Sequence, residues 1–316
     1  MAPDAFRTLP LTDLGPDPDR FSFSWPPPRE RAGLAERIAR QGLLRPLWVL
    51  REGGRWVVAA GTRRLAALAS LGWERAPVRV LEAAGPRGLW DRLLTDHLDH
   101  RSLNPVEAGL YLERRMAATG ETLEALAGGV LPLLGLAPRA GAAQDPLWLS
   151  GLPADLRDAV VEGRVPVAAA RVLRDVPRDE ALAVLRWLQA WRLGVNRFSE
   201  LARWALESAW REGLAAGDWL EREGLASWTG DPASLRAEVR RRRYPAVARH
   251  EEAFARAVRG LGLPPQARVE APPGFEGGWL ECKVRFRSLE ELARVLDELR
   301  GHVGAGRWDG LGELLG

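Results

Sequence analysis

The stretch GTRR at residues 61–64 places two arginines directly after a glycine, where a strand is expected to give way to a helix. Residues 55–60 (RWVVAA) are short, apolar and β-branched, which predicts a strand. Residues 65–72 (LAALASLG) repeat leucine at helical spacing and finish on a glycine, which predicts a helix that ends there. The free N–H groups of a first helical turn attract anions, and guanidinium groups strengthen that attraction. The sequence therefore offers a phosphate site, with ordinary solvated arginines as the alternative.

A second group of side chains with ligand chemistry occupies residues 96–100, which read DHLDH. Asp96 and His100 are four residues apart, so on a helix they share one face. Together with His97 and Asp99 they could form a metal site of carboxylate and imidazole ligands. The alternative is a set of polar side chains that face the solvent, which is where such residues are usually found.

A third group is the run of arginines in LRAEVRRRRYP, residues 235–245. The run consists of Arg240, Arg241, Arg242 and Arg243, and Arg236 precedes it. The chain has 45 basic and 42 acidic residues and a net charge of +3, so any binding of nucleic acid has to come from a local patch. These arginines are the candidate patch, and a solvated linker or helix end is the alternative.

The length and composition limit the classes of protein that are possible. A chain of 316 residues predicts two to three domains. The single cysteine, Cys282, excludes an intramolecular disulfide and a zinc site built from cysteines. The sequence contains no run of eighteen apolar residues and no secretory signal at its N-terminus. We therefore expect a cytoplasmic protein that does not enter the membrane.

The elements that position the GTRR turn are expected to form a small α+β unit. Residues 1–30 are rich in proline and should be extended or loop structure. A helix is expected over 31–41, and residues 43–61 predict a strand, a glycine turn and a second strand. Another strand is expected over 78–81, which completes a unit that ends near residue 90.

The middle of the chain, from residue 89 to about 225, has a helical pattern. One helix start is clearly marked, because Asn104 suits the N-cap and Pro105 suits the first helical position. The following residues, 226–265, are expected to be a linker that contains the arginine run.

The last residues predict a small unit that is incomplete by itself. Apolar and charged residues alternate along 280–287 (LECKVRFR), which predicts a half-buried strand. Ser288 and Glu291 form a capping box at the start of a helix whose leucines are expected to face inward. These leucines are Leu289, Leu292, Leu296 and Leu299. Such a small unit cannot bury its apolar faces alone, so a second copy of the chain is expected to complete it.

Three blocks of sequence, in the right order, resemble the ParB-type (ParB/RepB-like) chromosome and plasmid partition proteins. GLLRPLWVL, AAGTRRLAALASLGWERAPVRV and DHLDHRSLNPVEAG resemble the N-terminal domain, whose pattern runs GL-x-QP, GERR and ENLQR-x-x-LNP. LPADLRDAVVEGRVPVAAARVL resembles the segment after the family's helix-turn-helix, and EGGWLECKVRFRSLEELARVLDEL resembles its C-terminal dimerisation strand and helix. The resemblance covers most of the chain.

The resemblance implies a multi-domain protein of the α+β class. It implies a small ParB/sulfiredoxin-like nucleotide-binding domain at 1–100 and an all-helical domain with a degenerate helix-turn-helix at 101–225. An arginine-rich linker at 226–265 would lead to a small C-terminal dimerisation domain of strand and helix at 266–316.

The same resemblance implies a CTP-gated sliding clamp on DNA, with CTP and Mg²⁺ as cofactors and a homodimer held by the C-terminal domain. The GERR turn of the family cradles the phosphates. Carried over to this sequence, the nucleotide-binding residues are Gly42, Arg45, Gly61, Thr62, Arg63 and Arg64. We expect the protein to be cytoplasmic and associated with the nucleoid if it binds DNA.

Several departures from the family pattern affect the chemistry. GERR becomes GTRR at Thr62, and Arg45 stands where the family has glutamine. The family's catalytic glutamate is the shorter Asp96, and its metal-binding asparagine is His97. Imidazole is a poor ligand for Mg²⁺, which prefers hard oxygen atoms. We therefore expect nucleotide binding with weak or absent hydrolysis, at most a weak CTPase.

The region that resembles the DNA-reading helix also departs from the family. Residues 128–153 contain Arg139 as their only cation, and Pro138 and Pro146 limit any helix to a short one. Reading bases needs several polar or cationic side chains on a rigid helix. We expect weak sequence specificity, with DNA contacts from Arg139 and from the arginines at 240–243, and a steep dependence on salt.

The partners and the alternative functions follow from the same comparison. A basic N-terminal tail rich in glycine and leucine is not recognisable, which puts a ParA-type ATPase partner in doubt. One alternative is an adaptor or assembly protein on a ParB scaffold that does not act on DNA. Another is a ParB-like nuclease, for which Asp96 and Asp99 would have to hold a metal. Sulfiredoxin chemistry is excluded, because Thr62 stands where its cysteine would be.

Overall fold

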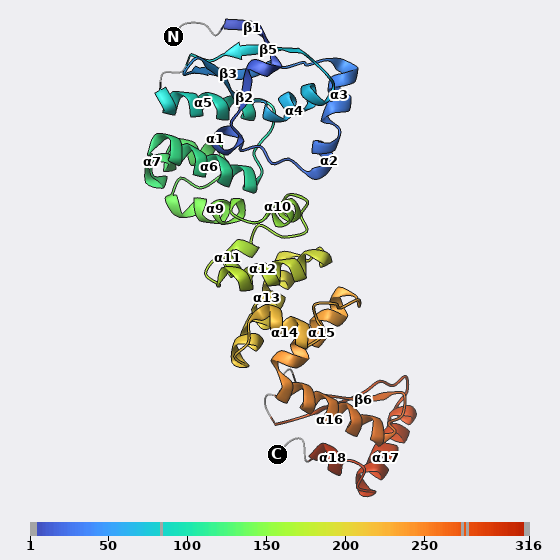
Figure 1. Ribbon diagram of the computed structural model, residues 1–316. Coiled ribbons are helices and arrows are strands. Elements are labelled where there is room, and N and C mark those ends of the chain that lie inside the picture. Colours follow the sequence, from blue (N-terminus) through green and yellow to red (C-terminus); the bar gives the residue numbers. More distant parts are fainter. Residues whose placement is uncertain (1–4, 83–84, 273–274, 276–277, 313–316) are drawn as a thin grey trace. The chain divides into compact units, whose positions relative to one another are not determined.

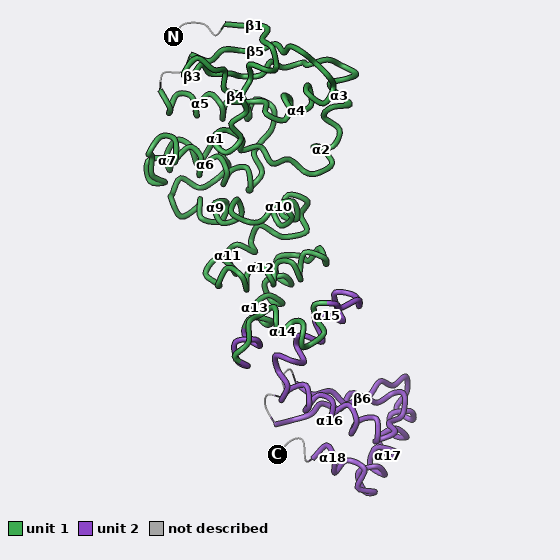
Figure 2. The backbone as a smooth tube through the Cα atoms, in the orientation of Figure 1, with its two compact units in different colours: residues 1–206, 213–226 green, residues 207–212, 227–316 purple. Residues whose placement is uncertain are grey.

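The computed structural model describes residues 5–82, 85–272, 275 and 278–312 of the chain. Its contacts divide the chain into two compact units (Figure 2). Unit 1 comprises residues 1–206 and 213–226, and unit 2 comprises residues 207–212 and 227–316. Figure 1 shows that the larger sheet belongs to the N-terminal end of the chain and that most of the remainder is helical. Within the described residues, every helix is too short or too polar to span a bilayer.

Unit 1 begins with a five-stranded mixed sheet in the order β1-β5-β3-β4-β2. The strands are β1 (Ala5–Pro10), β2 (Leu14–Pro16), β3 (Leu47–Glu52), β4 (Arg55–Ala60) and β5 (Arg75–Val80). The strands β3 and β4 form the predicted antiparallel hairpin, whereas β5 lies parallel to β3 and antiparallel to β1. The hairpin follows from its sequence, because Gly53 and Gly54 both adopt positive φ angles that glycine tolerates well.

One face of this sheet is covered by α3 (Leu34–Gln41) and α4 (Thr62–Ser70). Their apolar side chains, among them Ile38, Leu65 and Leu68, pack with strand residues such as Val49 and Val78 in one buried cluster. Because these apolar residues recur at helical spacing, they form one stripe on each helix, and that stripe is buried against the sheet.

The N-terminal residues, expected as extended or loop structure, contribute to the sheet. Residues 5–10 and 14–16 form two strands of the sheet, one at each edge. Pro10 and Pro16 end these strands, which fits the restriction of proline to the edges and ends of sheets. The helix expected over 31–41 is divided into α2 (Pro28–Ala32) and α3, with Gly33 between them. Pairing with β5 and with β4 makes the extended residues 5–10 and 14–16 strands of the sheet.

The remaining elements of unit 1 are helices. They are α1 (Pro18–Phe21), α5 (Gly85–Leu98), α6 (Pro105–Thr119), α7 (Leu123–Ala127), α8 (Val130–Leu133), α9 (Gln144–Ser150), α10 (Ala154–Val161), α11 (Ala169–Leu173), α12 (Arg178–Leu188), α13 (Val195–Arg211, whose last residues fall in unit 2) and α14 (Ala216–Arg222). Asn104 caps α6 and Pro105 is its first residue, as predicted. The helices α6 and α9 approach closely, because a Cβ atom on Gly109 would lie 2.1 Å from the carbonyl oxygen of Pro146.

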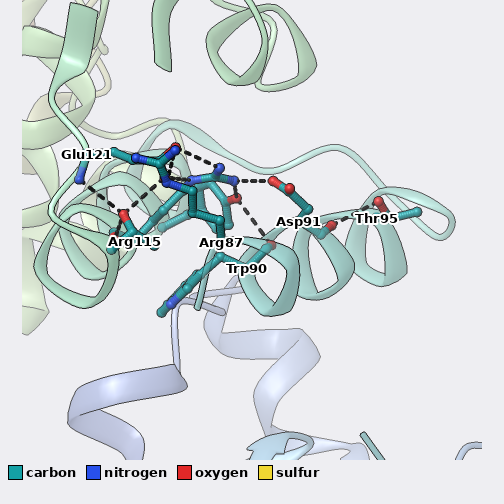
Figure 3. A network of polar contacts seen from close by, with 8 residues as sticks. Arg87, Trp90, Asp91, Thr95, Arg115 and Glu121 are labelled. Atoms are coloured by element: carbon teal, nitrogen blue, oxygen red, sulfur yellow. Dashed lines mark hydrogen bonds and ion pairs between the residues drawn. The ribbon is translucent and has the colours of Figure 1, made fainter. Parts of the chain in front are cut away.

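A buried arginine ties α5 to α6 and to the turn that follows α6 (Figure 3). The side chain of Arg115 is 4% exposed; it donates to Asp91 Oδ1 at 2.5 Å and to Glu121 Oε2 at 2.8 Å. It also donates to the hydroxyl of Tyr111 at 2.8 Å, and burial raises the pKa of that hydroxyl to about 12. Arg87 lies 3.4 Å from the other oxygen of Glu121. These contacts neutralise a buried charge with several partners, as a buried charge requires.

Unit 2 contains α15 (Pro232–Arg243), α16 (Pro245–Leu261), α17 (Leu289–Gly304) and α18 (Asp309–Gly312). Its strands β6 (Ala267–Glu270) and β7 (Glu281–Val284) form an antiparallel pair, and β7 lies within the strand predicted over 280–287. The buried clusters are small: one centres on Leu261 and the other on Leu299. So little buried apolar area gives limited stability to a unit of this size.

The structure adds detail to two expectations for the C-terminal half. Residues 226–265, expected as a linker, contain the helices α15 and α16, because Asp231 caps α15 and Pro232 and Pro245 occupy first-turn positions. Of the leucines expected to face inward from α17, Leu299 is buried, but Leu289 is 74% exposed and Leu296 is 50% exposed. Leu289 and Leu296 thus belong to an apolar face that the unit does not bury by itself.

Candidate functional site

A cavity of about 450 Å³ lies beside the GTRR turn in unit 1. Its walls come from the loop between α1 and α2, from both of the helices α2 and α3, from the end of β4 and start of α4, and from the end of α5. The predicted site residues that line it are Arg45, Gly61, Thr62, Arg63, Arg64, Asp96 and His97. Gly42 is not among the lining residues; it ends α3 with a φ of 74°. A cavity of this size suits a small organic ligand.

The glycine of the turn is required by the backbone and by its neighbours. Gly61 has a φ of 101°, and a Cβ atom there would lie 2.8 Å from Cδ2 of Leu47 and 3.0 Å from the guanidinium of Arg64. Gly61 is also the N-cap of α4, and no side chain caps the first N–H groups of that helix. The first turn of α4 therefore presents uncapped N–H groups at the cavity, as an anion site needs.

The two arginines of the turn have different environments. Arg63 donates from Nη2 to the carbonyl oxygen of Glu30 at 3.3 Å. Burial lowers the pKa of Arg63, and the nearby charges of Arg31, Arg101 and Arg37 lower it further. This crowding of like charge means that an anion placed there would be stabilised.

Arg64 contributes mainly to the shape of the cavity. Its Nη1 donates to the carbonyl oxygens of Arg45 at 3.1 Å and of Pro46 at 2.9 Å, which holds the start of β3 against the turn. Burial lowers the pKa of Arg64, while the negative charge of Asp96 raises it. Arg64 thus positions the wall that carries Arg45, and it places a guanidinium beside Asp96.

The segment 96–100 forms the end of α5 and the turn after it, and Asp96, His97 and His100 all line the cavity. The ring of His97 lies 5.2 Å from the ring of Phe23, centroid to centroid. Its Nε2 atom is buried without a hydrogen-bond partner, and burial lowers its pKa, which favours the neutral imidazole. His97 is therefore part of an aromatic wall.

The side chains at the cavity do not fit Mg²⁺ as a protein-built site. Among the described residues there is no group of three or more histidine, cysteine, aspartate or glutamate side chains that could hold a metal. The position that the family resemblance assigns to a metal ligand is the packed imidazole of His97. The expected roles of Mg²⁺ and of His97 as its ligand gain no support from this donor set.

Sequence reasoning missed the side chain that holds one wall of the cavity in place. Trp25 donates from its backbone N–H to Glu107 Oε1 at 2.7 Å and from Nε1 to Asp158 Oδ1 at 2.8 Å. Asn104 donates to its carbonyl oxygen at 2.9 Å, and the buried Glu107 accepts two hydrogen bonds from Arg101 at 2.5 and 2.6 Å. The only signal was a tryptophan within a proline-rich stretch.

The arginines expected to contact DNA lie in two places. Arg139 is exposed between α8 and α9. Along α15 every arginine of the run has a carboxylate partner: Arg240 pairs with Glu251 at 2.9 Å, Arg241 at 2.6 Å and Arg242 both pair with Glu238, and Arg243 pairs with Glu207 at 2.7 Å. DNA binding by these residues stays a prediction, and their charges are largely balanced within the protein.

The comparison with known families agrees with the N-terminal geometry. Residues 7–91 match the family model described as ParB N-terminal domain. The N-terminal part of the chain is thus similar to the N-terminal domain of ParB-type proteins. The matched residues include the whole five-stranded sheet except the first residues of β1, and also the Gly61 turn and both arginines. The ParB resemblance seen in the sequence is thereby confirmed, as is the α+β fold class.

Individual relatives were also found. A probable plasmid-partitioning protein ParB of Thermus thermophilus is 32% identical over 179 residues, which is 47% of this chain and 59% of that protein. The chromosome-partitioning protein Spo0J of the same organism is 26% identical over 299 residues, 92% of this chain and 89% of that one. The chain thus spans about three fifths of the first relative and most of the second.

Solved structures are less similar. The C-terminally truncated chromosome-partitioning protein ParB from Caulobacter crescentus, complexed to the centromeric parS site, is 20% identical with a TM-score of 0.35. It covers 62% of this chain, and 98% of its own length is matched. The same truncated protein complexed with CTP-gamma-S gives a TM-score of 0.27 at 19% identity, over 57% of this chain and 92% of its own.

Proposed function

We propose that this protein binds CTP in the cavity at the Gly61 turn and uses it to gate a dimeric clamp on DNA in chromosome or plasmid partition. The observation that carries the proposal is the uncapped N-terminus of α4 beside Arg63, within a cavity of about 450 Å³. This arrangement suits a polyphosphate group, because backbone N–H groups and guanidinium groups both donate to phosphate oxygens. The choice of cytidine rests on the family.

The homodimer is proposed to form through unit 2. Along α17, Leu289, Leu296 and Val303 are spaced seven residues apart and are 74%, 50% and 59% exposed. An exposed apolar stripe at a seven-residue spacing suits packing against the same helix of a second copy. The protein would act in the cytoplasm, at the nucleoid.

Site-specific reading of DNA is proposed to be weak. The helices α7, α8 and α9 contain 5, 4 and 7 residues, which is short for a recognition helix in the major groove. Contacts from Arg139 and from the arginines at 240–243 would then add mainly a salt-dependent, sequence-independent affinity. Hydrolysis of CTP is proposed to be slow, with Asp96 as the residue that would orient water.

The test is a calorimetric titration of the full-length protein with CTP, and with ATP, GTP and UTP for comparison. Selective binding of CTP is expected, with a loss of more than about tenfold in affinity in Arg63→Ala. Arg40→Ala is the matched control, since Arg40 is exposed on α3 in the same domain and does not line the cavity. Absence of binding by any nucleotide would overturn the proposal.

An adaptor function that does not involve DNA is the second candidate. The observation that favours it is the pairing of all four arginines of the run with carboxylates. A fluorescence titration with a DNA duplex at low and at moderate salt separates the two candidates. The clamp requires DNA affinity that rises when CTP is added. If DNA does not bind at either salt concentration, with or without CTP, the adaptor is favoured.

A further inference from the structure

The cavity at the Gly61 turn has an excess of positive charge that the protein itself does not balance. Its walls carry five arginines and two carboxylates, Glu30 and Asp96. The arginines are Arg37, Arg45, Arg63, Arg64 and Arg101. Within the described residues, Arg101 is the one member of this set that is ion-paired with a carboxylate, and that carboxylate, Glu107, is buried behind the wall. The cavity therefore favours a ligand with several negative charges.

The two carboxylates on the walls are themselves close to arginines. The charge of Asp96 acts on Arg64, and the charge of Glu30 acts on both Arg63 and Arg101. A divalent cation is usually held by one or two carboxylates together with substrate phosphates. Here a cation bound to either carboxylate would be repelled by the nearby guanidinium groups.

The imidazole of His97 does not supply the ligand that a divalent cation would need here. Its Nε2 atom is buried with no polar partner, and its ring packs against Phe23. The donor set is thus poor for a hard cation, whereas guanidinium groups can perform the same task of neutralising and orienting phosphate oxygens.

We propose that this cavity binds the polyphosphate of a nucleoside triphosphate without a divalent cation, with Arg63 and its neighbours Arg37 and Arg45 supplying the counter-charge. This inference rests on the proposed nucleotide-binding function and specifies its regulation: binding is independent of Mg²⁺. The N–H groups at the start of α4 and the forked guanidinium donors would bind the phosphate oxygens directly.

The experiment is a calorimetric titration of the full-length protein with CTP in excess EDTA and, separately, in excess MgCl₂ at matched ionic strength. The dissociation constant in EDTA is expected to be within about threefold of the value in Mg²⁺, or lower. A dissociation constant more than about threefold higher in EDTA overturns the metal-free inference and leaves nucleotide binding intact. An absence of binding in both buffers overturns the proposed function and this inference together.

A competition experiment tests which groups hold the phosphates. Inorganic tripolyphosphate in EDTA is expected to displace CTP, because the arginines recognise the phosphate chain without the base. Arg63→Gln should weaken both ligands by more than about tenfold in EDTA, whereas Arg40→Gln should change neither by more than about twofold. Failure of tripolyphosphate to compete, or equal effects of the two substitutions, would contradict the assignment; melting temperatures of both variants check that they are folded.

Discussion

The arginines around the cavity of unit 1 and the arginines of α15 in unit 2 use the same side chain in opposite ways. At the cavity, Arg63 has neighbours of like charge and its pKa is lowered by burial and by those neighbours. Along α15, Arg240 donates two hydrogen bonds to Glu251, which raises its pKa. The first arrangement leaves positive charge for a ligand, and the second uses it within the fold.

The number of arginines in a segment is therefore a weak guide to whether that segment binds an anion. The run at 240–243 is the densest group of arginines in the sequence, yet Glu207, Glu238 and Glu251 offset its charge. The cavity arginines are scattered over 37–101 and become a group only in the folded chain. What matters is the counter-charge at each guanidinium, and that depends on tertiary contacts.

The largest expected effect comes from Arg115, an arginine that is both buried and paired with carboxylates. Arg115→Met should lower the free energy of unfolding by about 3–5 kcal/mol, because Glu121 loses its main partner while it stays buried. Urea unfolding followed by circular dichroism measures the change. In the exposed control Arg171→Met, which removes a surface pair with Asp145, the change should be below about 1 kcal/mol. Similar losses in both variants would contradict this account of the network in Figure 3.

The anion site at the cavity can be disrupted through the backbone of the Gly61 turn. Gly61→Ala should cost about 1–3 kcal/mol in stability, because alanine is strained at a φ of 101° and its Cβ would meet Leu47. It should also weaken CTP binding by more than about tenfold. Gly53→Ala is the matched control: its φ of 53° is also positive, but the β3–β4 turn lies outside the cavity. The idea fails if both variants bind CTP equally well.

The arginines of α15 can be released from their ion pairs by removing the carboxylates that hold them. Glu238→Gln combined with Glu251→Gln should release Arg240, Arg241 and Arg242 and increase the sequence-independent affinity for DNA. The slope of log affinity against log salt should steepen by about 0.9 for each phosphate gained.

The matched control for that double substitution is Glu252→Gln with Glu298→Gln, which changes the net charge equally and leaves the pairs of α15 intact. Equal DNA affinity in the two double variants would show that the total charge matters and the pairing does not.

The smallest expected effect is a pH dependence in unit 2. The hydrogen bonds from Arg240 lower the pKa of Glu251, so this pair stabilises the fold above the ordinary carboxyl pKa of about 4.3 and loses its effect as the pH falls through the lowered value. Both side chains are well exposed, so the effect at neutral pH should be below about 1 kcal/mol. The stability difference between wild type and Glu251→Gln, measured by urea unfolding, should be constant from neutral pH to about pH 5 and vanish in stronger acid. A difference that grows in acid would contradict the pairing.

The sequence by itself determined the local elements of the site. The hairpin before Gly61, the helix after it, the cap of α6 at Asn104 and the strand 281–284 were all predicted and are all present. Positive φ at glycine, capping side chains and the period of apolar residues act over a few residues, so their signals can be read along the chain. The ParB resemblance followed from the same local blocks.

Only the tertiary structure decided which charges remain available. The bond between Trp25 and Asp158 joins residues 133 positions apart, and no local pattern announces it. The same is true of the carboxylates that offset the arginine run, of the strands formed by residues 5–16, and of the crowding of Arg63 by Arg31 and Arg101. A pairing between distant residues depends on how helices and sheet pack, because burial and proximity set the energy of a charge, and neither is a property of a short stretch of sequence.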